Sequence, residues 1–206
     1  MSSVVVLDYG SGNIHSVVRA IEGTGAQVTV SSSTSDACSA DGLVVPGVGA
    51  FAACMDQLHA IDGDQIIRER VEAGAPILGI CVGHQILFSA GVEHGIHAQG
   101  VGLFPGIVQA LPTARLPHMG WNEVTPGEGS TFLTDIDRFY FVHSYGVLSG
   151  EDIPQDAVGS WTNHDGVNLL SAVEYGPVLS TQFHPEKSGR AGLALLQRWV
   201  DSLEDS

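Results

Sequence analysis

The chain of 206 residues is 44% hydrophobic and 7% aromatic, so it can bury a full core and does not have the composition of a disordered protein. Its formal net charge of −15 argues against nucleic acid and anionic membranes as partners, because both repel an acidic surface. No apolar run reaches the roughly 18 residues that a membrane-spanning helix needs, and the first residues lack the basic segment of a signal peptide.

Predicted strands and helices alternate through the first ninety residues. Short β-branched runs predict strands at 3–8, 27–31, 42–45 and 76–80. Apolar residues at helical spacing predict helices at 14–21, 51–58, 66–71 and 82–90, the last of them ended by Gly91. This alternation predicts an open, mostly parallel sheet with helices on both faces. The glycine turns at 10–12, 47–49 and 79–83 would then meet at the carboxyl edge, where such sheets bind ligands.

From about residue 100 the pattern changes to short strand-like segments separated by Pro, Gly, Asp and Asn. These segments lie at 106–111, 121–124, 139–144, 157–162, 168–174 and 178–183. They predict an antiparallel or mixed extension of the sheet, followed by an amphipathic C-terminal helix around 196–203. Because no linker, repeat or low-complexity segment divides residues 1–206, we expect a single domain.

The cysteines and histidines predict neither a metal site nor a cofactor. Cys38, Cys54 and Cys81 fit neither a disulfide framework nor a CxxC metal site, so free thiols in a cytoplasmic protein are the simplest interpretation. The nine histidines form no HExxH or HxH pair. The turn at 10–12 matches part of a dinucleotide-binding GxGxxG, but His15 takes the place of its third glycine.

Cys81 lies where a predicted strand meets a predicted helix, in the stretch Gly79-Ile-Cys-Val-Gly83. This is the pattern of a nucleophile elbow, in which glycines two residues away on each side let backbone segments approach closely. The following helix would direct its N-terminal dipole at the sulfur and favour the thiolate, while the N–H of Val82 would face an oxyanion. On this pattern alone, a buried cysteine that serves only packing is an equally good interpretation.

A base and an acid follow in the stretch Gln182-Phe-His-Pro-Glu-Lys187. His184 precedes a proline, which holds it extended, so its ring and the Glu186 carboxylate can project to the same side. Together with Cys81, the pair would complete a set of nucleophile, base and orienting acid. The alternative interpretations are a strand-end histidine and a solvated turn. Lys187 is the only lysine in the chain.

These two stretches resemble the class I (triad) glutamine amidotransferases. The family motif GxCxGxQ is matched by Gly79, Cys81, Gly83 and Gln85. The resemblance implies a flavodoxin-like α/β sheet and a reaction in which the thiolate attacks the side-chain amide of glutamine. His184 would protonate the departing ammonia, and water would release glutamate from a thioester.

The resemblance also implies how the substrate is held. The N–H of Val82 and the turn at 46–49 would stabilise the oxyanion, the turn after one of its peptides reorients. The turn residues concerned are Gly47, Val48 and Gly49. Gln85 and the backbone at Ser144 and Tyr145 would hold the α-amino and α-carboxylate groups of glutamine.

Further stretches, spread from residue 8 to 188, resemble one branch of this family. They are DYGSGN at 8–13, PGVGAF at 46–51, PHMGWN at 117–122 and YFVHSY at 140–145. In that branch the glutaminase forms a heterodimer with a (β/α)₈ barrel cyclase of histidine biosynthesis and delivers ammonia to it. The cyclase makes imidazole glycerol phosphate and an aminoimidazole carboxamide ribonucleotide. The resemblance places Asn13, Trp121, Tyr140 and Lys187 at the subunit interface.

Three other functions fit these motifs less well. Triad amidotransferases of pyridoxal phosphate or anthranilate synthesis share the elbow, but PHMGWN and DYGSGN favour the histidine branch. A cysteine hydrolase or redox sensor would use Cys81 alone and has no need of the HPE triplet. A binding subunit without activity is not supported, because all three triad residues are present. His84 stands where the family often has methionine, and segments 91–102 and 150–167 match nothing diagnostic.

Overall fold

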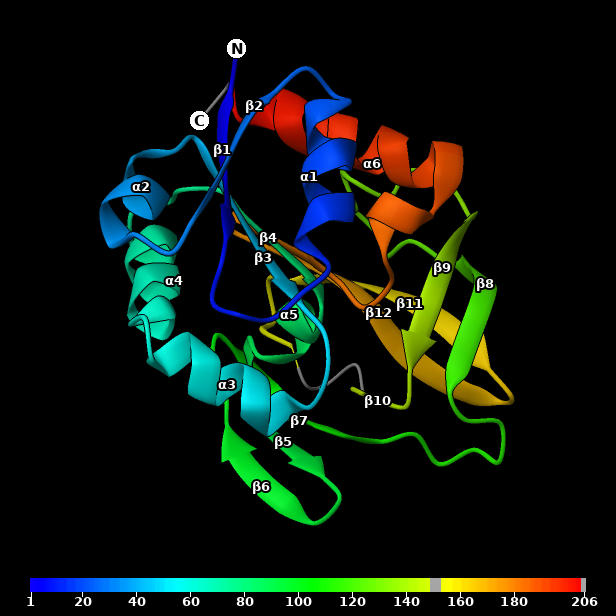
Figure 1. The fold of residues 1–206 in the computed structure, drawn as a ribbon. Coiled ribbons are helices and arrows are strands. Elements are labelled where there is room, and N and C mark those ends of the chain that lie inside the picture. Colours follow the sequence, from blue (N-terminus) through cyan, green and yellow to red (C-terminus); the bar gives the residue numbers. More distant parts are fainter. Residues whose placement is uncertain (149–152, 205–206) are drawn as a thin grey trace.

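The computed structural model describes residues 1–148 and 153–204, and its centre is a seven-stranded sheet (Figure 1). Its strands are β1 (Ser3–Leu7), β2 (Gln27–Ser31), β3 (Gly42–Gly47), β4 (Ile77–Cys81), β11 (Val158–His164), β12 (Val167–Tyr175) and β13 (Val178–Thr181). The strand order is β11-β12-β13-β4-β3-β1-β2. Strands β2, β1, β3, β4 and β13 are parallel, and β12 and β11 extend them antiparallel. The predicted flavodoxin-like sheet is therefore confirmed.

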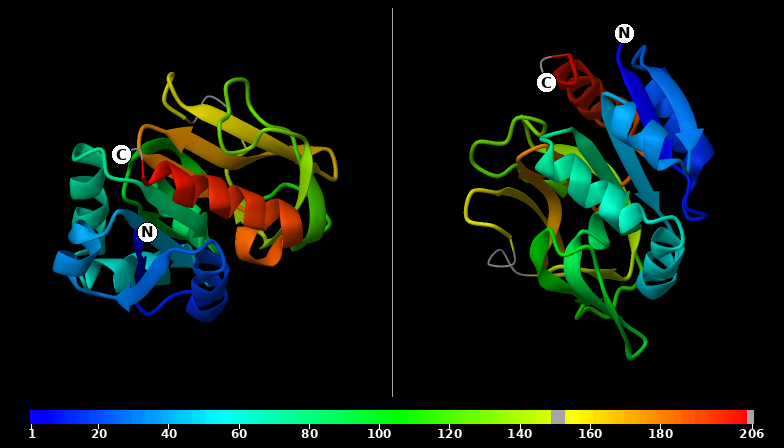
Figure 2. Two further views of the ribbon diagram at one scale, coloured as in Figure 1. Left: turned by 90° about the horizontal axis from the view of Figure 1, so that it is seen from above. Right: turned by 90° about the vertical axis from the view of Figure 1, so that its left-hand side faces the viewer.

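Helices cover both faces of this sheet (Figures 1 and 2). The helices are α1 (Ile14–Glu22), α2 (Thr34–Ser39), α3 (Phe51–His59), α4 (Gly63–Glu72) and α6 (Gly189–Ser202). α1 and α6 lie together on one face, and α2, α3 and α4 lie on the other. Because both faces are covered, the central strands are continuous apolar runs, such as Val4–Leu7 and Leu43–Val45. The sequence pattern does not predict α2, whose six residues are too few to show a helical period.

The predicted helix over 82–90 is wrong beyond its first turn. Helix α5 spans only Val82–Gln85, and Phe88–Glu93 form strand β5. The carbonyl of Leu87 accepts the N–H of Leu103 at 2.8 Å, which draws the chain into a second sheet. Pairing with residues that follow in the chain therefore overrides the helical spacing of the apolar side chains.

The second sheet has four strands and lies below the carboxyl edge of the main sheet (Figure 1). Beside β5 it contains β6 (Ile96–Gln99), β7 (Phe104–Ala110) and β10 (Tyr145–Gly146), in the order β10-β7-β5-β6. Gly91, predicted to end a helix, instead lies in β5 against the ring of Phe51 on α3. A Cβ at this position would come within 2.5 Å of a ring atom. Glycine is therefore needed here for close packing of the sheet on the helix.

Strands β8 (His118–Val124) and β9 (Asp137–His143) form a separate antiparallel pair beside α6 and β11. Of the six strand segments predicted after residue 100, only the last three extend the main sheet. The first three form the smaller sheets, because β7 pairs with β5 and β8 pairs with β9. The alternation of side chains predicts these strands but does not determine their partners.

Candidate active site

The backbone at Cys81 has the geometry of a nucleophile elbow. Its φ of 58° and ψ of −110° lie in a region that residues other than glycine rarely adopt. A Cβ on Gly83 would collide with the carbonyl of Val45 on β3, and a Cβ on Gly47 would lie 2.5 Å from the nitrogen of Gly83. The glycines thus permit the close backbone approach that the motif predicts. Helix α5 has only four residues, so the dipole behind the sulfur is that of a single turn.

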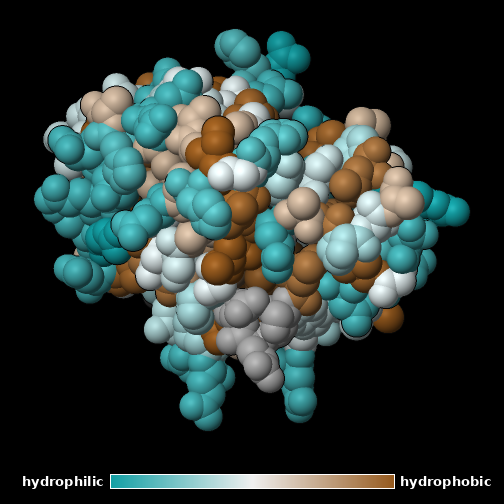
Figure 3. Space-filling view, turned by 90° about the horizontal axis from the view of Figure 1, so that it is seen from below, coloured by the Kyte–Doolittle hydropathy of each residue, from teal (hydrophilic) through white to brown (hydrophobic). Residues whose placement is uncertain are grey.

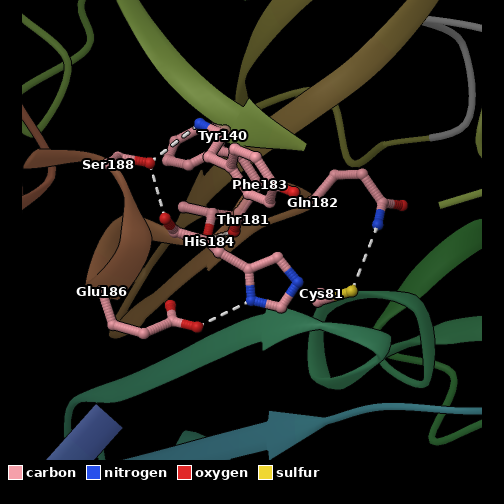
Figure 4. A network of polar contacts seen from close by, with 8 residues as sticks. All are labelled: Cys81, Tyr140, Thr181, Gln182, Phe183, His184, Glu186 and Ser188. Carbon is pink, nitrogen blue, oxygen red and sulfur yellow. Dashed lines mark hydrogen bonds and ion pairs between the residues drawn. The ribbon is translucent and has the colours of Figure 1, made fainter. Parts of the chain in front are cut away.

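His184 and Glu186 form a buried pair beside Cys81 (Figure 4). His184 Nδ1 lies 2.7 Å from Glu186 Oε1, and these side chains are 4% and 1% exposed. The other ring nitrogen faces the sulfur. His184 follows β13 in an extended conformation, where its N–H donates to the carbonyl of Tyr140 at 2.9 Å. Glu186 follows in the 3₁₀ turn η2 (Pro185–Lys187), which brings the carboxylate back under the ring.

The surroundings of His184 favour the charged imidazolium. Burial opposes the charge, but hydrogen bonds to the Cys81 sulfur and the Glu186 carboxylate outweigh it and raise the pKa of His184 to about 9. The charges of these two groups act in the same direction. At neutral pH the ring therefore holds a proton next to the sulfur, where a leaving group can accept it.

A cavity of about 750 Å³ opens in front of Cys81 and His184. The other predicted site residues that line it are Val48, Gly49, Val82, Gln85, Ser144, Tyr145 and Lys187. Of the predicted catalytic and substrate-binding residues, Gly47 and Glu186 do not line it, since Gly47 packs against Gly83 and Glu186 lies behind the ring of His184. These segments meet because β3, β4 and β13 are neighbours that end at the same edge of the sheet.

The turn after β3 is held by the side chain of Ser11. Ser11 Oγ accepts the N–H of Val48 at 3.2 Å and donates to the carbonyl of Val48 at 2.8 Å. Cys54 Sγ donates to the same carbonyl at 3.2 Å. The Val48 N–H is therefore bonded within the protein in this conformation and cannot also donate to an oxyanion in the cavity.

Gln182 is a buried residue beside the nucleophile that sequence reasoning missed. Its Nε2 donates towards Cys81 Sγ at 3.9 Å, and its Oε1 accepts from Gln85 Nε2 at 3.0 Å (Figure 4 shows the contact with sulfur). Gln85 Nε2 also donates to the carbonyl of Tyr145 at 2.8 Å. The signal was present, because Gln182 precedes His184 by two residues at a strand end and so projects to the same side.

Glu93 is a second missed residue. It lines the cavity and its Oε2 accepts the N–H of Phe51 at 2.8 Å, so a carboxylate is fixed at the cavity wall. It lies at the end of β5, within a segment that matches no diagnostic motif. Its position follows from the second sheet, which sequence reasoning did not predict.

The residues predicted at a subunit interface surround the turn η2. Trp121 and Tyr140 are cross-strand partners on β8 and β9, with their ring centroids 6.3 Å apart. Trp121 is 49% exposed. Asn13 is exposed at the start of α1, which contacts η2, and Lys187 belongs to η2 itself. The four residues therefore lie on one accessible side of the molecule, next to the cavity.

Across residues 1–148 and 153–204, no three His, Cys, Asp or Glu side chains are grouped so that they could hold a metal ion. Over the same ranges, no helix is both long enough and apolar enough to cross a membrane.

The glutamine amidotransferase class-I family matches residues 5–202, which contain the elbow, the His184–Glu186 pair and the cavity. The chain belongs to this family. Among amidotransferases similar to it is the imidazole glycerol phosphate synthase subunit HisH of Mycobacterium tuberculosis, 54% identical over 204 residues that cover 98% of each chain. The subunit of the same name from Corynebacterium diphtheriae is 49% identical over 210 residues, which cover 98% of this chain and 100% of that one.

Solved structures show the same amidotransferase fold. A crystal structure described as glutamine amidotransferase has a TM-score of 0.75 at 19% identity and covers 98% of this chain and 99% of its own. The structure of PurLQS from Thermotoga maritima has a TM-score of 0.70 at 22% identity, with coverage of 98% and 100%. At these identities the likeness concerns the fold.

Proposed function

We propose that residues 1–206 form one class-I domain that hydrolyses the side-chain amide of glutamine to glutamate and ammonia. The observation that carries this proposal is the elbow cysteine, Cys81, beside the buried pair of His184 and Glu186. Amide hydrolysis through a covalent intermediate needs a nucleophile, a proton carrier and a group that orients it. The family of the chain and the names of its relatives support the same activity.

The reaction proceeds in two halves. The Cys81 thiolate attacks the amide carbon, the C–N bond breaks, and the departing nitrogen takes the proton of the His184 imidazolium. Water then attacks the resulting γ-glutamyl thioester and gives a proton to the neutral ring, and the C–S bond breaks to return the thiolate and release glutamate. Glu186 keeps the ring oriented and stabilises its charged form in both halves.

Two backbone donors are assigned to the oxyanion. The N–H of Val82 directly follows the nucleophile, as in other elbows. The second donor comes from the turn at 46–49 once it reorients, because the Val48 N–H is otherwise bonded to Ser11. Removing one oxyanion donor typically lowers the rate about 10²–10³-fold, so this turn acts as a switch for the chemical step.

The charged α-groups of glutamine bind at the far wall of the cavity. Gln85 and the backbone at Ser144 and Tyr145 hold this end of the substrate. The Glu93 carboxylate is assigned as the counter-charge of the α-ammonium group, because it lines the same cavity and is fixed by the N–H of Phe51.

The ammonia passes to a second subunit, a (β/α)₈ barrel cyclase, within a heterodimer. The cyclase uses it to make imidazole glycerol phosphate and an aminoimidazole carboxamide ribonucleotide in histidine biosynthesis. The relatives' name as synthase subunits supports this assignment. A covered route is chemically useful, since ammonia released into water at neutral pH is protonated and loses its nucleophilicity.

The cyclase docks over the residues around η2, namely Asn13, Trp121, Tyr140 and Lys187. Half-exposed Trp121 is suited to be an anchor, and Lys187 is suited to pair with an acidic group of the barrel. Apolar residues are also exposed among hydrophilic ones on the lower face of the molecule (Figure 3). Val48 and Leu116, which line the cavity, are each 42% exposed. A partner that contacts Val48 and Leu116 would cover the mouth of the cavity.

The reaction is assigned to the cytoplasm, and its chemistry is assigned to the side chains of the protein itself. Cys38, Cys54 and Cys81 are free thiols, which a reducing compartment maintains. Nucleophile, proton carrier and orienting acid all come from the protein, so the scheme contains no cofactor.

The test is glutamate release from glutamine by the chain alone and together with a cyclase barrel subunit and its nucleotide ligand. We expect weak hydrolysis alone and a rise of about 10²-fold or more with partner and nucleotide, as expected for the gain of an oxyanion donor. Cys81→Ser should abolish the reaction in both conditions. Cys38→Ser is the matched control, because Cys38 is exposed and does not line the cavity.

Each outcome discriminates between functions. Hydrolysis that depends on Cys81 but ignores the barrel would retain the glutaminase and reject the cyclase partner, which favours another triad amidotransferase. No hydrolysis that depends on Cys81 under any condition would reject the glutaminase and return Cys81 to a packing or redox role.

A further inference from the structure

Two histidines outside the proposed triad connect the cavity wall to strand β8. His118 on β8 and His143 on β9 are direct cross-strand partners, with His118 Nδ1 3.0 Å from His143 Nε2. His143 lines the cavity, and its Nδ1 lies 2.8 Å from the carbonyl oxygen of Tyr145. At the other end, Asn122 Nδ2 lies 3.1 Å from His118 Nε2. The four residues form one continuous chain of polar contacts.

The chemistry of the groups determines which partner donates in each of these hydrogen bonds. A carbonyl only accepts, so His143 Nδ1 carries the proton and donates to Tyr145. In a neutral ring the Nε2 of His143 is then an acceptor, which requires His118 Nδ1 to donate. His118 Nε2 accepts in turn from Asn122, whose Oδ1 accepts the N–H of Glu123 at 2.8 Å and thereby fixes the amide orientation.

The rings are held rigidly and kept neutral. His118 is 3% exposed and lies between two rings, Phe141 at a centroid distance of 4.5 Å and His164 at 4.1 Å. Burial, together with the neighbouring histidines, lowers the pKa of His118 to about 3. Burial likewise lowers the pKa of His143 to about 4, although the bond to Tyr145 acts in the opposite direction. A proton added to either ring would place two N–H groups against each other.

The Tyr145 carbonyl is the junction between this chain and the cavity. It accepts from His143 Nδ1 and from Gln85 Nε2, both at 2.8 Å, so protein donors occupy both of its lone pairs. The same Gln85 amide contacts Gln182, which reaches the sulfur of Cys81. Tyr145 therefore fixes the wall through its carbonyl and has no lone pair left for the substrate.

We propose that His143 and His118 are positioning residues that act through the Tyr145 carbonyl to hold Gln85 and the 144–145 backbone in the arrangement that binds glutamine. This inference rests on the proposed glutaminase function and assigns to it two residues that touch neither the sulfur nor the leaving group. Loss of this series of hydrogen bonds should weaken glutamine binding and leave the chemistry at Cys81 largely intact.

The test compares steady-state glutamine hydrolysis by variants of the protein, each in complex with the cyclase subunit and its ligand. His143→Leu removes both hydrogen bonds, and we expect KM for glutamine to rise about tenfold or more with kcat within about threefold. His143→Asn retains a donor at the Nδ1 position and should recover most of the KM. His118→Phe retains the ring stacking but not the donor and should give an intermediate KM.

Two further readouts separate positioning from loss of structure. The rate of Cys81 alkylation by iodoacetamide, a small reagent that needs no α-group contacts, should stay within about twofold of wild type in every variant. Nitrogen-15 NMR of the wild-type histidines should show both rings neutral with the proton on Nδ1. The matched control is His164→Phe, which keeps the stacking on His118 and lies outside the hydrogen-bonded chain.

The results distinguish this inference from the proposed function. If wild type hydrolyses glutamine through Cys81 but His143→Leu leaves KM within twofold, the positioning inference is wrong and the glutaminase stands. If alkylation falls by the same factor as KM rises, the histidines merely maintain the fold and the inference is again overturned. Absence of wild-type hydrolysis would overturn both.

Discussion

The hydroxyl of Ser11 determines which way the Val48 backbone faces. It bonds both the N–H and the carbonyl of Val48, and so holds the turn at 46–49 in a conformation in which this N–H is not free to donate to a ligand. Ser11→Ala removes both bonds. Because a net hydrogen bond contributes about 0.5–1.5 kcal/mol, we expect glutamine hydrolysis without the partner to rise about 2- to 10-fold. Glutamate release by the isolated chain measures this.

The matched control is Ser89→Ala, since Ser89 Oγ also donates to a backbone carbonyl, that of Phe104, at 3.0 Å, but away from the turn. It should leave the partner-free rate unchanged. A Ser11→Ala rate equal to or below wild type would show that Ser11 does not restrain the turn.

At the scale of residues, the sequence predicts the elements of the site that are local. Cys81 with its glycines, and His184 with Glu186, are each encoded within a few positions, and the structure places them together. Glu93 reaches the cavity only through the second sheet, and Gln182, which does not line the cavity, contacts the sulfur of Cys81. No local pattern around Glu93 distinguishes it from a surface acid, which is why motif reasoning does not find it.

Among the elements, helix α2 depends on a side chain from another helix. Arg70 on α4 is 2% exposed, and its guanidinium donates to the carbonyls of Ala37, Ala40, Asp41 and Pro76 at 2.7 to 3.1 Å. Arg70→Met would leave these carbonyls without their donors. Since an unsatisfied buried polar group costs about 1–3 kcal/mol, we expect the free energy of unfolding to fall by about 3 kcal/mol or more. Urea denaturation measures this change.

Arg68→Met is the control on the same helix, because Arg68 is exposed. Its free energy of unfolding should stay within about 0.5 kcal/mol of wild type. An equal loss in both variants would mean that the α4 helix itself, and not the guanidinium contacts, is affected.

The elements that periodicity predicts are those whose burial repeats regularly along the chain. Examples are β1, α1 and β3, which lie where their apolar residues indicate because each buries one continuous face or run. The C-terminal helix α6 is also present, but it begins at Gly189, before the predicted start near 196. α2 has too few residues for a period and is fixed by Arg70. The helix predicted over 82–90 gives way to strand β5 from Phe88, because Phe88 pairs with Phe104 on β7 in the second sheet. Local pattern cannot show such pairing.

For the molecule as a whole, buried histidines set the response to acid. Burial is the main cause that lowers the pKa of His84 and His118 to about 3 and of His143 to about 4, from 6.5. Below pH 6.5 the unfolded chain binds protons that the folded chain refuses. Each of the three therefore lowers the free energy of unfolding by up to about 1.4 kcal/mol per pH unit as pH falls towards 4.

His84→Met tests this effect. His84 Nε2 is buried and has no hydrogen-bond partner among the described residues. Removing the ring therefore takes a partner only from the Ser180 hydroxyl, which lies 2.8 Å from His84 Nδ1. Urea denaturation between pH 5 and 7.5 should show a slope below pH 6.5 that is about one-third smaller than in wild type, since one of three such groups is gone. An unchanged slope would assign the acid response to the carboxylates instead.

Above pH 6.5 the free energy of unfolding is expected to fall as pH rises, which is the opposite of the effect in acid. The pKa of His184 is raised to about 9, so its ion pair stabilises the fold fully below pH 6.5 and loses that contribution as pH rises through 9. Maximum stability is thus expected near pH 6.5, between the two effects. In Cys81→Ser the decline should still begin near pH 6.5 but should end at lower pH and be smaller in total, because the sulfur partner is the first of the groups that raise the pKa of His184 in the folded state.

Lys187 gives the molecule one natural chemical handle at its cavity. It is the only lysine in the sequence, and it lines the cavity beside His184. Apart from the α-amino group at residue 1, an acylating reagent meets one primary amine in the whole chain. A fluorophore attached there would sit at the cavity without any engineered cysteine, and its emission would report both occupancy of the cavity and the arrival of a partner.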